Sequence, residues 1–222
     1  MSVRRFLCAV MLVLLCGCSL PNYKDRVGRW YNDDVIVRFT PGGFVVHKDP
    51  KGLTLLEAVK SSGDTVETRM VMSDSKEPAL AGTWRLDVVW SDGKKHHGTL
   101  NYPDGRQVEL KYAADLFSGA NSLASNLGAN SLAGRWQAVS GAPDGFPEVF
   151  ELIAPDLYVA VMRFRGNRKL LSDRFEIDLP NVHFGGHYYQ TRMSEDKLEL
   201  TEVGRDGPVG PTVEYRRVQP PG

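Results

Sequence analysis

Two histidines near the end of the chain are the residues best suited to metal binding. They occur as His183-Phe184-Gly185-Gly186-His187. In one extended strand, residues four apart share a face but lie about 13 Å apart, so only a turn at the glycine pair would bring both rings to one ion. His96 and His97 are adjacent and should point to opposite faces of a strand. Because a zinc site needs three or four ligands, we expect surface histidines, with no metal and no cofactor.

Motifs of common enzyme active sites are missing from the sequence. It contains no Gly-x-Ser-x-Gly, no phosphate-binding glycine loop and no His-Glu-x-x-His. Asp33-Asp34 fits a turn, and the other carboxylates are scattered over a chain in which 24% of residues are charged. We therefore expect a protein that is not an enzyme. An envelope hydrolase is the weakest function considered, because no residue stands out as its nucleophile.

The most basic stretch of the chain is a second candidate for binding. Arg163, Arg165, Arg168 and Lys169 surround a predicted hairpin tip at Gly166-Asn167. This cluster either contacts anionic headgroups, peptidoglycan or an acidic partner, or is a solvated loop.

The first eighteen residues combine a basic start with an apolar run that ends at a cysteine. Arg4-Arg5 precedes an apolar segment from Phe6 to Leu15, and Leu15-Cys16-Gly17-Cys18 places small residues before the last cysteine. An apolar run of about ten residues is too short for a transmembrane helix and fits a processed secretion signal. The pattern resembles the lipobox of bacterial lipoproteins. The resemblance implies cleavage after residues 1–17 and acylation of Cys18, on sulfur and on the new amine, with fatty acids such as palmitate.

The residues around Cys18 also predict where the protein resides. In such lipoproteins an aspartate after the cysteine retains the protein at the inner membrane, and Ser19 stands here instead. The resemblance therefore implies a lipid-anchored protein of the outer membrane, on its periplasmic face. A plain secretory signal or an uncleaved anchor is the alternative. Since Cys8 and Cys16 would leave with the signal, Cys18 would be the single cysteine of the mature chain, which excludes an intrachain disulfide.

The charge balance excludes nucleic acid as a partner. The chain has 27 basic and 27 acidic residues, and loss of Arg4-Arg5 with the signal leaves 25 against 27. No run of five or six like charges is present. We expect membrane attachment through the lipid alone and an envelope protein as partner.

Alternation of apolar and polar residues predicts β-strands throughout the remaining chain. From Trp84 to Trp90, apolar side chains occupy every second position, as in a half-buried strand. Turn pairs such as Asp92-Gly93 supply the positive φ of tight antiparallel hairpins. Strands spaced by roughly 8–12 residues predict an all-β sandwich or barrel. One segment differs: Asp115 to Gly128 carries apolar residues at helical spacing and predicts a short helix, with a flexible linker as the alternative.

A Gly-x-Trp motif occurs three times, each time at the start of a strand run. The copies are Gly28-Arg29-Trp30, Gly82-Thr83-Trp84 and Gly134-Arg135-Trp136. The motif resembles the first strand of lipocalin-like β-barrels in bacterial envelope proteins. The resemblance implies that the tryptophan closes one end of a barrel and that the glycine permits a tight chain crossing. It also implies a late arginine, Arg216 or Arg217, stacked on Trp136.

These patterns divide the chain into two β domains. We expect a lipidated tether over 18–27, an N-terminal β domain over 28–112, a short helix and linker over 113–131, and a lipocalin-like domain over 132–222. Because few contacts should cross the linker, the last segment should fold alone. The alternative is one larger barrel or curved sheet.

Barrels of this size should be filled by their own side chains. The sequence therefore favours a protein-binding or scaffold module of the cell envelope, in a secretion or assembly machine or neutralising a toxin. The alternative is a carrier or sensor for an apolar molecule or a metal, which would need a cavity of about 300 Å³ or more.

Overall fold

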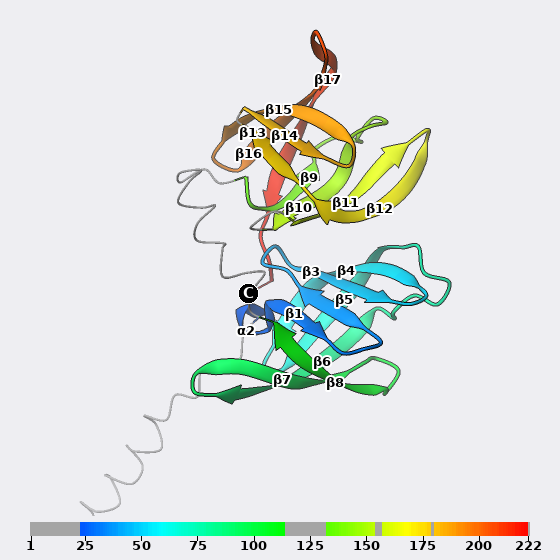
Figure 1. Ribbon diagram of the computed structural model, residues 1–222, viewed down its shortest axis with the longest axis vertical. Helices are drawn as coiled ribbons and strands as arrows, with labels where there is room; N and C mark the ends of the chain where they lie inside the picture. Colours follow the sequence, from blue (N-terminus) through cyan, green and yellow to red (C-terminus); the bar gives the residue numbers. More distant parts are fainter. Residues whose placement is uncertain (1–22, 114–131, 154–156, 179, 222) are drawn as a thin grey trace, which may run out of the picture.

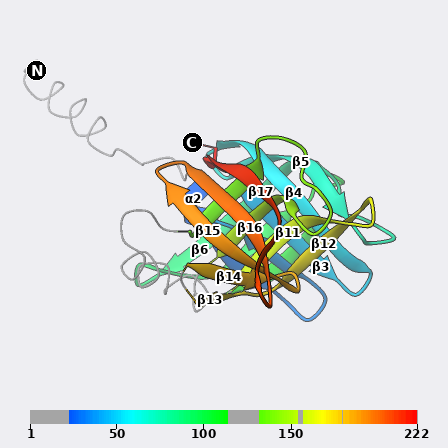
Figure 2. The ribbon, with the colours of Figure 1, turned by 90° about the horizontal axis from the view of Figure 1, so that it is seen from above.

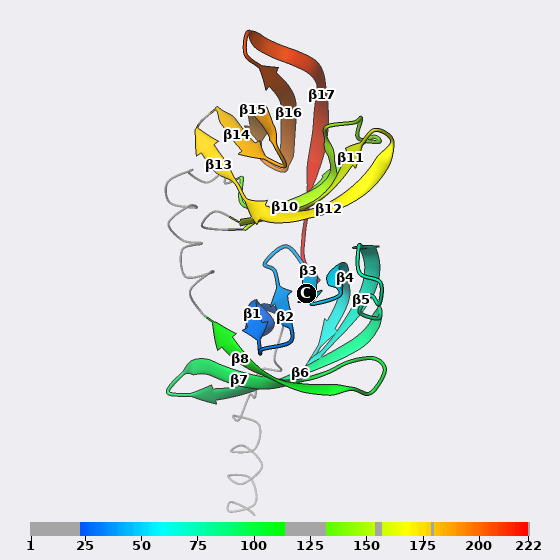
Figure 3. The ribbon, with the colours of Figure 1, turned by 45° about the vertical axis from the view of Figure 1, so that its right-hand side comes forward.

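The computed structural model describes residues 23–113, 132–153, 157–178 and 180–221, in which the chain is almost entirely β. Two antiparallel units lie along the longest axis of the molecule (Figure 1). The first is a closed eight-stranded barrel, and the second is a nine-stranded sheet curled into a nearly closed barrel (Figure 3). The prediction of two small antiparallel barrels is thus confirmed, and the alternative of one larger barrel is wrong. The expected signal peptide, Cys18 and nearly all of the expected helix and linker lie outside the described residues.

In the first barrel each strand pairs with the next, and β1 closes the ring by pairing with β8. A four-residue helix, α2 (Tyr23–Arg26), precedes β1 and packs on the barrel, where the Tyr23 hydroxyl donates to the Phe44 carbonyl at 3.0 Å. No helix in the described ranges has the length and hydropathy of a membrane span. The strands are β1 (Gly28–Tyr31), β2 (Ile36–Phe39), β3 (Phe44–Asp49), β4 (Gly52–Ser62), β5 (Thr65–Ser73), β6 (Gly82–Ser91), β7 (Lys94–Asn101) and β8 (Gln107–Ala113).

In the second barrel, β9 lies between β10 and β17, and the sheet extends from this centre to its edge strands β12 and β13. All strand pairing remains within this half of the chain. The strands are β9 (Gly134–Ala138), β10 (Pro147–Ile153), β11 (Leu157–Phe164), β12 (Asn167–Arg174), β13 (Glu176–Asp178), β14 (Asn181–Phe184), β15 (His187–Ser194), β16 (Lys197–Gly204) and β17 (Gly207–Val218).

The hairpin turns owe their geometry to residues that accept positive φ. Asp92 and Gly93 have φ of 52° and 71° between β6 and β7, at the turn that the sequence predicts. Between β11 and β12 the turn is centred on Arg165 and Gly166, with φ of 50° and 76°, one residue before the predicted Gly166-Asn167. Two consecutive positive φ values are typical of the tight turn that matches strand twist.

The three Gly-x-Trp motifs adopt one local structure. Each tryptophan is fully buried, and each indole N–H donates to the carbonyl four residues earlier. Each glycine has a φ that side-chain-bearing residues rarely adopt: 142° at Gly28, 139° at Gly82 and 117° at Gly134. The first barrel holds two copies, on β1 and β6, and the second holds one, on β9. The indole bonds are Trp30 to Arg26 at 2.8 Å, Trp84 to Leu80 at 3.0 Å and Trp136 to Leu132 at 2.9 Å.

The two barrels pack directly on each other, contrary to the expectation that few contacts would cross between the halves. Seen from above, the second barrel covers the first (Figure 2). The β3–β4 face of the first barrel meets the outer face of β10, β11 and β12. Burial of aliphatic and aromatic side chains from both units stabilises this interface through the hydrophobic effect. The buried residues are Phe44, Val46, Leu55, Val149, Ile153, Val159, Val161 and Leu170.

Trp90 departs from its predicted environment. It shares the inward parity of Trp84, Leu86 and Val88, but β6 continues beyond its pairing with β5, which ends at Arg85. Trp90 is consequently 50% exposed. The period-two pattern identifies the face of a strand and not the point at which the strand leaves the barrel.

Candidate functional site

Arg217 is the late arginine that lies over Trp136. Its guanidinium carbon is 4.3 Å from the centre of the indole ring, and its Nη1 donates to the Ala133 carbonyl at 2.7 Å. Desolvation by burial lowers the pKa of Arg217. Arg216, the other arginine considered, is exposed. This contact joins cross-strand partners of β9 and β17.

The first barrel covers its two tryptophans with tyrosines instead. The ring centres of Trp30 and Tyr112 are 4.9 Å apart, and those of Trp84 and Tyr102 are 5.0 Å apart. A Cβ added to Gly28 would lie 2.3 Å from the ring of Tyr112. The glycine of the motif therefore makes room for the residue that covers the tryptophan.

His183 and His187 lie on opposite faces of the β14–β15 hairpin. A turn does form at Gly185-Gly186, but it pairs His183 with Tyr188 and His187 with the core residue Phe184. The His183 ring stacks on Tyr188 at 4.1 Å between centres, whereas His187 Nδ1 is 2.7 Å from a carboxylate oxygen of Glu202.

The other histidines, His47, His96 and His97, do not belong to a metal-binding group of the described residues either. His96 and His97 are exposed on β7. His47, which sequence reasoning did not single out, is buried with its Nε2 3.2 Å from the Tyr102 hydroxyl, and burial lowers its pKa. Across the described part of the chain, no group of three or more His, Cys, Asp or Glu is arranged to hold a metal.

The basic hairpin β11–β12 is partly neutralised. Glu148 accepts from both Arg163 and Arg168, at 2.6 Å and 2.8 Å. Arg165 and Lys169 form no ion pair with the carboxylates of the described residues. The tip is held by the Gly166 N–H, which donates to the Asp144 carboxylate at 3.0 Å. Two cations of the predicted contact cluster are therefore paired with Glu148, whereas Arg165 and Lys169 are exposed, with the Lys169 ammonium 5.9 Å from the ring centre of Phe164.

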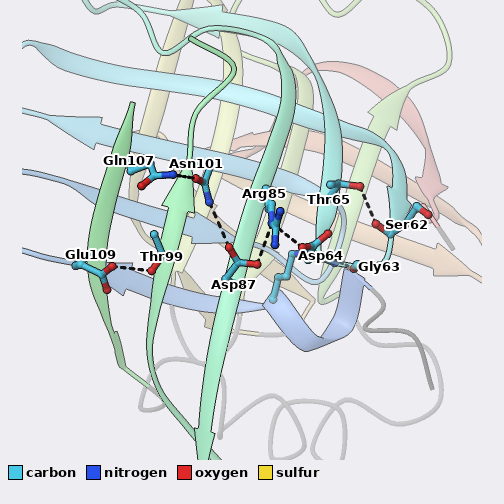
Figure 4. Close-up of polar contacts among 11 residues, drawn as sticks. Ser62, Gly63, Asp64, Thr65, Arg85, Asp87, Thr99, Asn101, Gln107 and Glu109 are labelled. Atoms are coloured by element: carbon cyan, nitrogen blue, oxygen red, sulfur yellow. Dashed lines mark hydrogen bonds and ion pairs between the residues drawn. The ribbon is translucent and has the colours of Figure 1, made fainter. Parts of the chain in front are cut away.

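A depression of about 480 Å³ opens on the first barrel between α2 and β6. Leu86, Val88 and Trp90 line it together with the carboxylates of Asp25, Asp64 and Asp87. Figure 4 shows the polar wall beside it, in which Arg85 bonds to Asp64 at 2.6 Å and to Asp87 at 2.9 Å. The wall continues onto β7 and β8 through Thr99, which donates to Glu109 at 2.6 Å (Figure 4). This depression is open to solvent and polar on one side.

Glu151 of β10 is a fully buried carboxyl group between the two barrels. The Thr40 hydroxyl donates to its Oε2 at 2.5 Å and the Gly42 N–H donates to its Oε1 at 2.6 Å. Burial raises the pKa of Glu151 to about 7, although both hydrogen bonds and the charge of Arg135 act in the opposite direction. A Cβ on Gly42 would lie 2.7 Å from the Glu151 carboxyl carbon, so only glycine permits this approach.

Arg135, the middle residue of the third Gly-x-Trp motif, also crosses between the barrels. Its Nη2 bonds to Glu57 of β4, and its guanidinium lies 4.2 Å from the ring centre of Phe44. Burial acts to raise the pKa of Glu57, but its bonds to Arg135 and Arg69 hold that pKa below the usual value. Sequence reasoning missed both interface charges. The available signal was a carboxyl group inside the apolar run Val149 to Ile153.

Within the described residues, the buried polar groups between the barrels and the aromatic groups at the Gly-x-Trp motifs bond to other parts of the same chain. The Glu151 carboxyl group accepts hydrogen bonds from Thr40 and Gly42 of the neighbouring barrel, and the Arg217 guanidinium covers the indole of Trp136. No protein-family model, curated protein or solved structure matches this chain.

Proposed function

We propose that the protein is a non-enzymatic, lipid-anchored outer-membrane protein that acts as a protein-binding or scaffold module on the periplasmic side. Its anchor would be acylated Cys18. Its partner would be another envelope protein, in a secretion or assembly machine or as a toxin that it neutralises.

The filling of both barrels is the observation that carries this proposal. Trp30, Trp84 and Phe39 in the first barrel, and Trp136 and Phe150 in the second, are all at 0% exposure. Aromatic rings pack against one another inside the barrels, as between Phe150 and Phe184, whose ring centres are 5.2 Å apart. Interiors packed in this way give a rigid framework, which suits presentation of outer surfaces more than enclosure of a ligand.

The β11–β12 hairpin is the surface that we assign to the partner. Arg165 and Lys169 project there without carboxylate partners in the described residues, on a tip stiffened by Asp144 and Glu148. A rigid tip with two available cations fits an acidic patch on another protein, where electrostatic complementarity raises specificity and association rate.

Photo-crosslinking in living cells tests this function. A crosslinking amino acid at Arg165 or Lys169 should give an adduct with one defined envelope protein. The same residue at Arg106, on the β7–β8 turn of the first barrel, is the matched control and should not give that adduct. Equal adducts from both positions, or none from the hairpin, would contradict the assignment.

The carrier alternative is supported by one observation, the depression of about 480 Å³ beside Trp90. Its volume is sufficient for a small ligand, and Leu86 and Val88 give it an apolar side. A stoichiometric small molecule retained by the native protein, and lost on Trp90→Ala, would favour this alternative.

A further inference from the structure

The β6–β7 hairpin carries an aromatic side chain beyond the barrel. Trp30, Trp84 and Trp136 are fully buried, whereas Trp90 is 50% exposed and its neighbour Val89 is 43% exposed. An indole combines a large apolar ring with one N–H donor, which suits the boundary between water and lipid.

Two lysines lie next to this tryptophan on the β7 side, whereas the depression that Trp90 also lines includes Asp25, Asp64 and Asp87. Lys95, its cross-strand partner, places its ammonium 5.6 Å from the indole centre, and Lys94 is exposed at the adjoining turn. Burial lowers the pKa of Lys95 to about 8, so most of this group is charged at neutral pH. Asp92 is the single acidic residue between Trp90 and His97. An exposed aromatic ring with an exposed lysine at the adjoining turn is complementary to an anionic membrane surface.

The hairpin also lies beside the point where the N-terminal segment joins the barrel. Lys95 donates to the carbonyl of Val27 at 3.1 Å, directly after α2. Cys18 precedes Tyr23 by five residues (23 − 18), and a residue spans at most about 3.6 Å, so the two are within about 18 Å of each other. An acyl anchor on Cys18 would therefore hold this side of the barrel close to the leaflet.

We propose that the β6–β7 hairpin is a membrane-contact site, in which Trp90 enters the interfacial region of the leaflet that holds the anchor and the exposed Lys94 binds anionic headgroups. Lys95 holds the hairpin against Val27 and Tyr112. This inference rests on the proposed lipid anchor. The β6–β8 side lies away from the second barrel (Figures 1 and 3), so this contact would leave the partner-binding hairpin β11–β12 free.

Quenching of tryptophan fluorescence by brominated phospholipid tests the contact, because Trp90 is the exposed one of the four tryptophans. The protein is first recovered from cells and placed in vesicles of phosphatidylcholine and phosphatidylglycerol. A second sample, the chain from Cys18 onward, is coupled through Cys18 to a maleimide-bearing phospholipid. It holds every residue that the structure describes and is anchored whether or not cells acylate it.

Both samples should lose Trp90 emission in brominated vesicles, with a blue shift of the remaining emission. Trp90→Phe should abolish the quenching, and Lys94→Gln should reduce it in vesicles with phosphatidylglycerol. A tryptophan at the distal β17 position, Val209→Trp in the Trp90→Phe chain, should stay unquenched; Val209 is 64% exposed.

The outcomes separate the two proposals. A cell-derived protein that lacks acyl groups would refute the anchor, and the maleimide-coupled sample would still decide the contact. Absence of quenching in the coupled sample would overturn the membrane-contact site, as would equal quenching from position 209. A change in Trp90 emission that occurs only when an envelope protein is added would also overturn the membrane-contact site, in favour of a protein partner.

Discussion

Arg217 of β17 covers Trp136 of β9 at 4.3 Å, and the Gly134 position lies directly beneath its guanidinium, where a Cβ would be 2.7 Å from Nη1. Arg217 and Trp136 are cross-strand partners, so this contact adds to the hydrogen-bonded pairing of the first and last strands of the second barrel. A cation over an indole contributes roughly 0.5–2 kcal/mol, and the Arg217 bond to Ala133 adds to it.

Removing either member of this pair should destabilise the protein. Trp136→Ala should lower the free energy of unfolding by about 3–5 kcal/mol, because it empties a fully buried indole site. Arg217→Gln should lower it by about 1–3 kcal/mol, and the exposed neighbour Arg216→Gln by less than about 0.5 kcal/mol. Urea unfolding measures all three. Equal losses from the two arginines would refute the pairing.

A second prediction concerns Gly28, the glycine of the first Gly-x-Trp motif. Gly28 has a φ of 142°, and an added Cβ would lie 2.3 Å from the Tyr112 ring. Gly28→Ala should therefore lower the free energy of unfolding by at least about 1–3 kcal/mol. Gly141→Ala is the control, since nothing lies within 4 Å of its added Cβ, and it should be close to neutral. Thermal unfolding of the two variants compares them directly. Similar melting temperatures would show that Gly28 is not needed for the approach of Tyr112.

The buried carboxyl of Glu151 predicts how stability depends on pH. Its pKa is about 7 in the folded chain, against 4.5 when unfolded, so the folded state holds the proton more tightly. The free energy of unfolding contributed by this group should fall as pH rises from about 4.5 to about 7, by roughly 3 kcal/mol in total, and then level off.

Glu151→Gln isolates this contribution. The side chain keeps its shape but does not titrate, so the difference in stability between wild type and variant should shrink or reverse across the same pH range. Urea unfolding at a series of pH values measures it. A difference that is independent of pH would show that Glu151 titrates at an ordinary pKa.

The sequence predicted the barrels but not the way in which they pack. Alternation and turn pairs depend on neighbours in the chain, so strands such as Trp84 to Trp90 could be identified locally. The contact between barrels depends on residues far apart in sequence. The sequence signal of this contact is an apolar run without alternation, because such a run is typical of strands buried on both faces. Two such runs are Phe44-Val45-Val46 and Tyr158 to Met162.

Among the candidate sites, too, some contacts could be predicted from the sequence and others required the strand pairing of the structure. The resemblance to lipocalin-like barrels implied Arg216 or Arg217 near Trp136, and the structure selects Arg217. The opposite faces of His183 and His187 could not be derived, because parity changes at the Gly185-Gly186 turn. The pairing of Arg163 and Arg168 with Glu148 required the register of β10 against β11.

The second barrel produced alone, as residues 132–222, should fold but associate with itself. All strand partners of β9 to β17 lie within this segment, so circular dichroism should show a cooperative β-rich transition. Separation uncovers the apolar face that includes Val159 and Val161, and light scattering should detect oligomers. Val161→Lys should restore a monomer. A fragment without cooperative melting would refute independent folding.

The intact mass of the protein, measured under native conditions after extraction from the cell envelope, tests the central claim most directly. An anchored module with filled barrels predicts the mass of residues 18–222 plus a diacylglyceryl group and a further acyl chain on Cys18, with no small molecule bound. A mass that includes residues 1–17, or one without acyl groups, would contradict the anchor. A stoichiometric bound ligand would contradict the scaffold and favour the carrier.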